Sequence, residues 1–197
     1  MKNFSILLFS ITVLGFGFTW NKKENKEEIL SKLQTQAENI KIVATKKSKI
    51  NPEVAFLIDM KIHSGKNRFF VYDLKSNAIL DQGLVAHGSG SEIATKDELL
   101  FSNTPDSNCT SLGNYTIENS YFGKFGKAYK LIGLDKTNNN AFSRNIVLHK
   151  YSLMPYNEQN FRIINSLGCP MVNEKFYKRL EKIIDNSKSK IILKIYY

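Results

Sequence analysis

With 197 residues, the chain is long enough for one domain with a sizeable core and too short for two comfortable ones. Its formal net charge of +10 favours an anionic partner such as nucleic acid, a membrane surface or an acidic wall polymer, although lysines that only keep the protein soluble explain it equally well. With three histidines and two cysteines, and without a P-loop, dinucleotide fingerprint or zinc-ligand cluster, the sequence argues against a metal site, and we expect no cofactor.

The first 20 residues have the layout of an export signal. Lys2 gives a positive start, residues 4–18 are nearly all apolar, and a charged stretch follows. The apolar run is slightly short of the ~20 residues of a spanning helix, and no A-x-A-like cleavage site is evident near Thr19. We therefore expect residues 1–20 to be a signal peptide or an N-terminal anchor, with membrane association through this segment left open. The expected location is the periplasm or cell envelope, which argues against nucleic acid as a partner.

Residues 21–52 are expected to form a helical lead-in. This stretch is rich in Lys, Glu and Gln, and it carries apolar residues at helical spacing: Ile29, Leu33, Ala37, Ile40 and Ala44. The spacing predicts an amphipathic helix over residues 22–49. Pro52 then stands where the first residue of a helix tolerates a missing N–H, so residues 54–62 are predicted to form a second helix.

From Arg68 onward the pattern changes to strands. Residues 69–72 and 78–86 are predicted to form a hairpin across the turn residues 74–77. Further strands are predicted at 112–117, 130–134, 146–149 and 191–197, and a helix follows Asn173, a plausible N-cap. Between two of these strands, residues 121–129 form an aromatic stretch interrupted by glycines. The fold class is therefore expected to be mainly β, within the α+β group.

A histidine and a cysteine stand in settings that suit acyl transfer. His149 ends the apolar strand 146–149, and Cys169 follows in the run Ser166-Leu167-Gly168-Cys169-Pro170. Gly168 permits a close backbone approach, and Pro170 keeps Cys169 out of the helical region, so the thiol is presented on a rigid turn. An ordinary cysteine is only a few per cent thiolate at neutral pH, so a nucleophile here needs an imidazole to take its proton. The alternative is a packed cysteine and a core histidine without chemistry.

This arrangement resembles the L,D-transpeptidases of the YkuD type, in which a histidine closing an apolar strand is followed by Ser-x-Gly-Cys. The likeness extends upstream to the murein L,D-transpeptidase catalytic domain proteins through five landmarks in the same order: Val85-Ala86-His87-Gly88, Phe101-Ser102-Asn103, Ser111-Leu112-Gly113, Asn138-Asn139-Asn140-Ala141 and Gly168-Cys169-Pro170. It covers residues 53–197, which we take as the catalytic domain. The resemblance implies a sandwich of mixed β-sheets with N-terminal helices and one helix after the catalytic cysteine.

The resemblance also implies the chemistry. Cys169 would attack a peptidoglycan stem peptide to give a thioester, with His149 as the base, and the acyl group would pass to an amine to form a 3-3 cross-link or exchange the terminal D-amino acid. Release to water would instead make the protein an L,D-carboxypeptidase or endopeptidase. A third alternative is a secreted wall-binding protein without catalysis. The oligomeric state is not indicated by any pattern.

Other site residues follow from the same comparison. Backbone N–H groups around Gly168 and Cys169 are candidates for the oxyanion hole, with Ser166 Oγ as a supporting hydrogen-bond partner. Many family members have Gly after the histidine and a branched residue plus Arg after the cysteine, where this chain has Lys150 and Pro170-Met171. We therefore consider Arg144, Lys150 and His87 for substrate binding, with a surface ion pair as the alternative for Arg144. Both cysteines are expected to be free thiols, and Cys169 to have a raised thiolate fraction beside an imidazolium.

Overall fold

The computed structural model describes residues 13–46, 49–94 and 98–197, with side chains from Lys26 onward. The chain divides into two compact units, residues 1–35 and 36–197. Helix α1 (Val13–Lys46) includes most of the helix expected over residues 22–49, but it begins within the predicted leader and ends three residues earlier. Ala37 and Ile40 in its last turns are buried. Most of the predicted signal or anchor segment, residues 1–12, lies outside the described residues. Within the described part, no helix is both long and apolar enough to cross a membrane.

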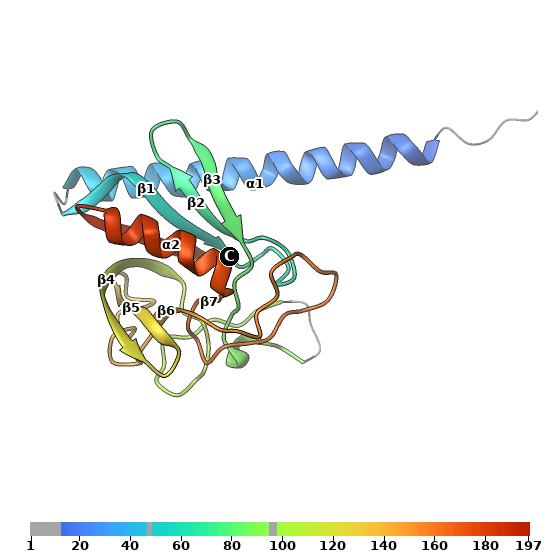
Figure 1. The fold of residues 1–197 in the computed structure, drawn as a ribbon. Coiled ribbons are helices and arrows are strands. Elements are labelled where there is room, and N and C mark those ends of the chain that lie inside the picture. The colour runs from blue at the N-terminus through green and yellow to red at the C-terminus, as the bar shows by residue number, and fades with distance from the viewer. Residues whose placement is uncertain (1–12, 47–48, 95–97) are drawn as a thin grey trace, which may run out of the picture. The chain divides into compact units, whose positions relative to one another are not determined.

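One mixed sheet of eight strands forms the body of the second unit, in the order β3-β2-β1-β8-β4-β5-β6-β7. The strands are β1 (Ile50–Asp59), β2 (Phe69–Asp73), β3 (Ala78–Gly83), β4 (Gly113–Gly123), β5 (Gly126–Gly133), β6 (Val147–Lys150), β7 (Met171–Val172) and β8 (Lys190–Tyr196). Helix α2 (Glu174–Asn186) lies between β7 and β8 in the chain and is labelled in Figure 1. The mainly β class, the mixed pairing of the strands and the helix after the cysteine are confirmed.

The predicted second helix at residues 54–62 is wrong, because most of this segment belongs to β1. Strand β1 pairs with β2 on one side and with β8 on the other, and Ala55 to Ile58 are fully buried. A strand buried on both faces is a continuous apolar run without alternation, so periodicity cannot separate it from a buried helix. Pro52 falls within a register irregularity between Ile50 and Ala55, where a missing N–H costs no regular ladder bond.

Both hairpins of the sheet contain segments that the sequence placed correctly. Strands β2 and β3 pair antiparallel around residues 74–77, as predicted, and Asn77 adopts a positive φ of 53° in that turn. The predicted strands 112–117 and 130–134 belong to β4 and β5, but these strands run much further toward each other. The aromatic stretch is thus the outer half of a second hairpin, closed by the pair Gly123 and Gly126.

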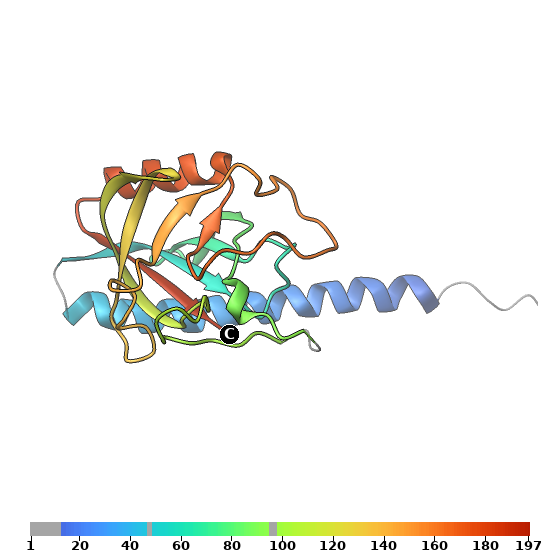
Figure 2. The ribbon, with the colours of Figure 1, turned by 90° about the horizontal axis from the view of Figure 1, so that it is seen from below.

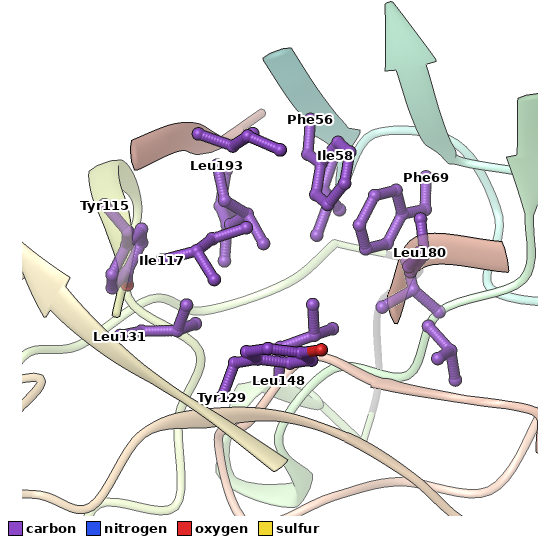
Figure 3. Close-up of a cluster of buried hydrophobic side chains, with 14 of the residues drawn as sticks. Phe56, Ile58, Phe69, Tyr115, Ile117, Tyr129, Leu131, Leu148, Leu180 and Leu193 are labelled. Carbon is purple, nitrogen blue, oxygen red and sulfur yellow. The ribbon is translucent and has the colours of Figure 1, made fainter. Parts of the chain in front are cut away.

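The core lies between the sheet and α2. Phe56, Ile58, Phe69, Leu193 and Leu180 converge with side chains from β4, β5 and β6, as Figure 3 shows. Helix α2 contributes Phe176, Tyr177 and Leu180, and the ring of Phe176 meets that of Phe69 edge to face at 5.2 Å. Burying an aliphatic or aromatic side chain of this size contributes about 1.5–3 kcal/mol. The packing therefore fixes α2, and with it the short strand β7 immediately before the helix.

Asn173 is the N-cap of α2, as the sequence predicted. Its Oδ1 accepts a hydrogen bond from the Phe176 amide at 2.9 Å, and its Nδ2 donates to Pro155 O at 3.1 Å. Asn173→Ala removes both bonds from a buried position, so we expect the free energy of unfolding to fall by about 1–2 kcal/mol in urea titrations. Asn186→Ala, at the exposed end of the same helix, is the control and should have a much smaller effect. Equal losses for the two variants would contradict the capping role.

Candidate active site

Parallel pairing of β6 with β7 brings the predicted histidine and cysteine together. His149 is in register with Met171, and Lys150 with Val172, and the two strands run side by side in Figure 2. Cys169 precedes Met171 by two residues, as Val147 precedes His149. The cysteine therefore lies beside Val147, whose amide donates to Cys169 Sγ at 3.4 Å. Because alternate residues of a strand share a face, Val147 and His149 face the same side.

The turn before β7 has a conformation that requires glycine. Gly168 adopts φ +112°, and a Cβ there would lie 2.9 Å from Cys109 O and 3.2 Å from Ile146 Cδ1. Ser166 Oγ accepts from the Gly168 amide at 3.2 Å and donates to Cys169 O at 2.7 Å. The expected supporting role of Ser166 is thus to bind both sides of the turn. Since the Gly168 N–H is engaged, the Cys169 amide becomes our candidate for the oxyanion hole.

The Val-Ala-His-Gly landmark holds this turn from its other side through backbone hydrogen bonds. The Ala86 amide donates to Met171 O at 2.8 Å, the Ser166 amide to His87 O at 2.9 Å, and the Ser89 amide to Ser166 O at 2.8 Å. The turn that carries Cys169 is therefore held between β6 and residues 86–89, which explains why this landmark accompanies the Gly-Cys-Pro run.

His87 is placed in the interior and does not line the cavity that contains Cys169. Its Nδ1 lies 2.9 Å from Nη2 of the buried Arg68, and its Nε2 lies 3.3 Å from Glu92 Oε1. Because an arginine can only donate, Nδ1 accepts and the proton is on Nε2. Burial and the neighbouring guanidinium lower the pKa of His87 to about 4. The structure thus gives His87 a place in the polar support of the turn and away from the substrate side.

A cavity of about 560 Å³ contains the Cys169 and His149 side chains together with Ser166 and Asn145. Its walls are mainly aromatic and aliphatic, and its charged lining residues are Lys124 and Arg144, both cations. A hollow of about 620 Å³ lies elsewhere, between residues 117–120 and 187–191, and is lined by neither histidine nor cysteine. The chemistry therefore points to the first cavity.

His149 is oriented by a backbone carbonyl. Its Nδ1 lies 3.0 Å from Lys150 O, so Nδ1–H donates there and Nε2 is left as the basic nitrogen. The imidazole is only 4% exposed, and this burial lowers its pKa, opposed by the hydrogen bond to Lys150 O. No carboxylate is needed to fix the tautomer. The Lys150 ammonium itself lies 3.5 Å from Glu174 Oε1, and Lys150 does not line the cavity.

The resting state of Cys169 corrects one expectation. Burial raises the pKa of its thiol, and the Val147 amide and the Arg144 guanidinium offset this only in part. A raised thiol pKa together with a lowered imidazole pKa favours a neutral thiol beside a neutral imidazole at pH 7. The expected increase in thiolate fraction is therefore wrong for the free protein. Both cysteines are free thiols.

Arg144 lines the cavity, but its N–H groups donate hydrogen bonds to the loop that precedes β4. Its Nη1 donates to Ser102 O at 3.0 Å and to Ser111 Oγ at 2.6 Å, and its Nη2 donates to Cys109 O at 2.8 Å. These contacts join the Phe-Ser-Asn and Ser-Leu-Gly landmarks to Arg144, which lines the same cavity as Cys169. The alternative prediction, a surface ion pair for Arg144, is wrong, because its hydrogen-bond partners are neutral oxygens of this loop.

The family resemblance implied that the aromatic stretch 121–129 lines the substrate groove, with packing between strand ends as the alternative, but no residue at the tip of the β4–β5 hairpin was assigned to the site. Tyr121, Lys124 and Phe125 line the cavity, and the Phe125 ring lies against the His149 imidazole. The sequence carried a signal for this turn, because two residues flanked by Gly123 and Gly126 have a spacing typical of a hairpin.

Among the described residues, no group of three or more His, Cys, Asp or Glu side chains is placed to hold a metal ion.

The raised pKa of Cys169 can be tested by alkylation. We expect the iodoacetamide rate of Cys169 to reach its plateau at higher pH than that of a model thiol, because only the thiolate reacts and burial disfavours it. Mass spectrometry of the peptide containing Cys169 separates it from Cys109. Urea-unfolded protein is the control and should return the midpoint to the ordinary value. A native midpoint at or below that value would contradict the neutral resting pair.

Comparison with known proteins identifies the family of the chain. Residues 22–196 match the family model of the L,D-transpeptidase catalytic domain. No curated protein matches the chain. Among solved structures, the Ldtfm-avibactam carbamoyl enzyme aligns over 74% of this chain and 49% of its own, with 11% identity and a TM-score of 0.45. An L,D-transpeptidase from Mycobacterium smegmatis aligns over 74% and 59%, with 10% identity and a TM-score of 0.42.

A third structure, an L,D-transpeptidase from Mycobacterium tuberculosis H37Rv, aligns over 74% of this chain and 58% of its own, with 13% identity and a TM-score of 0.38. The chain thus spans about half to three fifths of the length of these structures. The family match covers nearly all of the chain, including every landmark of the site. The chain belongs to the family of L,D-transpeptidase catalytic domains.

Proposed function

We propose that the protein is a cysteine acyltransferase acting on peptidoglycan stem peptides. The observation that carries the proposal is that β6 and β7 place Cys169 and His149 in one cavity, with Nδ1 of the imidazole engaged by Lys150 O and Nε2 left as the base. Family membership supplies the substrate class, and the net charge of +10 suits an anionic wall polymer.

The reaction follows from this geometry. His149 Nε2 takes the proton of Cys169 Sγ while the sulfur attacks the carbonyl carbon of the residue before the terminal D-amino acid. The Cys169 amide stabilises the oxyanion of the tetrahedral intermediate. On collapse the C–N bond breaks, His149 returns the proton to the departing amine, and a thioester remains. An amine of a second stem peptide, or the amine of a free D-amino acid, then attacks the thioester and gives a proton to His149. The C–S bond breaks, and His149 returns the proton to Cys169 Sγ.

A neutral resting pair suits this sequence of steps. An imidazole with a lowered pKa is unprotonated at pH 7 and can accept a proton. A thiol with a raised pKa keeps its proton until the substrate carbonyl is in place. The thiolate then forms as the bond to the substrate forms, with the Val147 amide and the Arg144 guanidinium favouring the developing anion.

Substrate carboxylates are assigned to the cationic side of the cavity. Of the three residues considered from the sequence, His87 is interior, Lys150 is near Glu174, and Arg144 lines the cavity with its donors engaged. Lys124, on the hairpin tip, also lines the cavity. We propose that Lys124 makes the direct contact with a stem-peptide carboxylate, and that Arg144 contributes its charge.

Two other functions remain as alternatives. Transfer of the same acyl group to water would make the protein an L,D-carboxypeptidase or endopeptidase, and no contact within the described residues selects an amine over water. A wall-binding protein without catalysis is disfavoured by the free Nε2 of His149 and by the hydrogen bond that Cys169 Sγ accepts from Val147.

Incubation with purified muropeptides and mass analysis of the products tests the proposal. We expect 3-3 cross-linked or D-amino-acid-exchanged products from the wild type. Cys169→Ala should give none, and His149→Ala should be slower by on the order of 10²-fold to 10⁴-fold. Cys109→Ala, at the other free thiol, is the matched control and should retain activity. Shortened stems alone would favour the hydrolytic alternative, and activity in Cys169→Ala would rule out the mechanism.

Export can be tested separately. Because residues 1–20 combine Lys2 with a long apolar run, we propose that this segment directs the chain to the cell envelope. Fractionation of cells producing the full-length chain should find the protein in the periplasmic or membrane fraction. A variant lacking residues 2–20 should remain in the cytoplasm and serves as the control. Full-length protein in the soluble cytoplasm would contradict export and the wall substrate together.

A further inference from the structure

The turn of the β4–β5 hairpin brings an aromatic ring, Phe125, against the imidazole of His149. Gly123 and Gly126 form the last pair of the ladder, and Lys124 and Phe125 are the two residues between them. Gly126 adopts φ +79°, a conformation in which glycine costs little. The turn is therefore built for a sharp reversal, and it places Phe125 over β6.

Phe125 contacts two rings. One is the imidazole of His149 in β6, and the other is the ring of Tyr151, the residue directly after β6. The centroid of the Phe125 ring lies 4.6 Å from that of His149 with an interplanar angle of 23°, a stacked arrangement. On Tyr151 it makes an edge contact at 5.8 Å and 84°. Phe125 is 39% exposed, whereas His149 is only 4% exposed. The phenyl ring therefore takes the solvent-facing position and covers one face of the imidazole.

Two contacts together define the orientation of the imidazole. The hydrogen bond from Nδ1 to Lys150 O fixes one edge of the ring but tolerates tilting about that bond. A ring stacked on its face opposes this tilt, and aromatic pairs of this kind contribute about 0.5–1.5 kcal/mol beyond the area they bury. The stack also excludes water from one face, in keeping with the burial that lowers the pKa of His149.

We propose that Phe125 is a positioning residue that holds the His149 imidazole so that Nε2 faces Cys169, and that shields it from water. This inference rests on the proposed role of His149 as the base. Phe125 acts through His149 and requires no contact with the reacting atoms. The hairpin tip then has two separate roles, with Lys124 toward the substrate and Phe125 toward the base.

Other groups near His149 leave its titration readable. Lys124, Arg144, Tyr151 and Cys169 line the same cavity as His149, and Lys150 follows it in the chain. Burial raises the pKa of the Cys169 thiol, away from the range in which an imidazole titrates. His87 is distinguished by its own pKa of about 4, and a His149→Ala spectrum assigns the remaining imidazole signals. The pKa of His149 can therefore be followed by NMR without any turnover.

The experiment compares Phe125→Ala with Phe125→Tyr and with Phe122→Ala. Phe122 is on the same hairpin and 84% exposed, so it is the matched control for loss of a phenyl ring. In Phe125→Ala we expect the pKa of His149 to rise toward its ordinary value of 6.5. We also expect kcat on muropeptides to fall by on the order of tenfold, because a misaligned base costs rate. Phe125→Tyr, which keeps the ring, should restore both, and Phe122→Ala should change neither.

The outcomes separate this inference from the proposed function. An unchanged pKa of His149 and an unchanged kcat in Phe125→Ala would overturn the positioning role. A raised KM with unchanged kcat and pKa would overturn it in favour of direct substrate contact. If the pKa rises in Phe125→Ala while even the wild type is inactive on muropeptides, the positioning of the imidazole stands and the proposed function fails. Circular dichroism of each variant verifies that the fold is retained.

Discussion

The structure depends on the pairing of a two-residue strand, β7, with β6. This pairing alone sets the offset between His149 and Met171, and therefore the position of Cys169 beside Val147. A strand this short has little stability of its own, so its neighbours hold it. Ala86 binds Met171 O on the other edge, Val172 is fully buried, and α2 begins directly afterward with a capped first turn.

The loops around the cysteine turn are held by two arginines, the buried Arg68 and the partly buried Arg144. Arg68 is 1% exposed and donates Nε and Nη2 to Val85 O, at the start of the Val-Ala-His-Gly landmark. Burial lowers the pKa of its guanidinium to about 9, and the nearby Asp59 opposes this. Arg144 donates to Ser102, Cys109 and Ser111 in the loop before β4 and lines the same cavity as Cys169. Because a buried donor without partners costs about 1–3 kcal/mol or more, such groups tie loop geometry more strictly than apolar contacts do. The landmarks of the sequence are in large part the anchor points of these two arginines.

The electrostatics of the site favour the neutral forms of Cys169 and His149 at rest. Desolvation disfavours both the thiolate and the imidazolium, so the charge-separated pair is not the resting state. The groups that offset this penalty for the anion, the Val147 amide and the Arg144 guanidinium, are fixed by backbone pairing and by four loop acceptors. Preorganised donors of this kind need no rearrangement as charge develops, so a neutral resting pair is compatible with the proposed attack by Cys169.

The sequence by itself determined the features that depend on neighbours along the chain. Apolar spacing gave the lead-in helix and α2, turn residues gave the β2–β3 hairpin, Asn173 gave the cap, and the ordered landmarks gave the family and the His149–Cys169 pair. Residues 54–62 were misassigned because a strand buried on both faces has no polar alternation to reveal its period. Only the tertiary structure decided that Lys150 O orients His149, that His87 faces Arg68 in the interior, that the Arg144 donors serve a loop, and that Phe125 stacks on the imidazole. Apart from the contact of His149 with Lys150 O, each of these interactions joins segments far apart in sequence. The Lys150 contact itself depends on the burial of the imidazole. The identity of each partner is therefore set by packing and leaves no local pattern in the sequence.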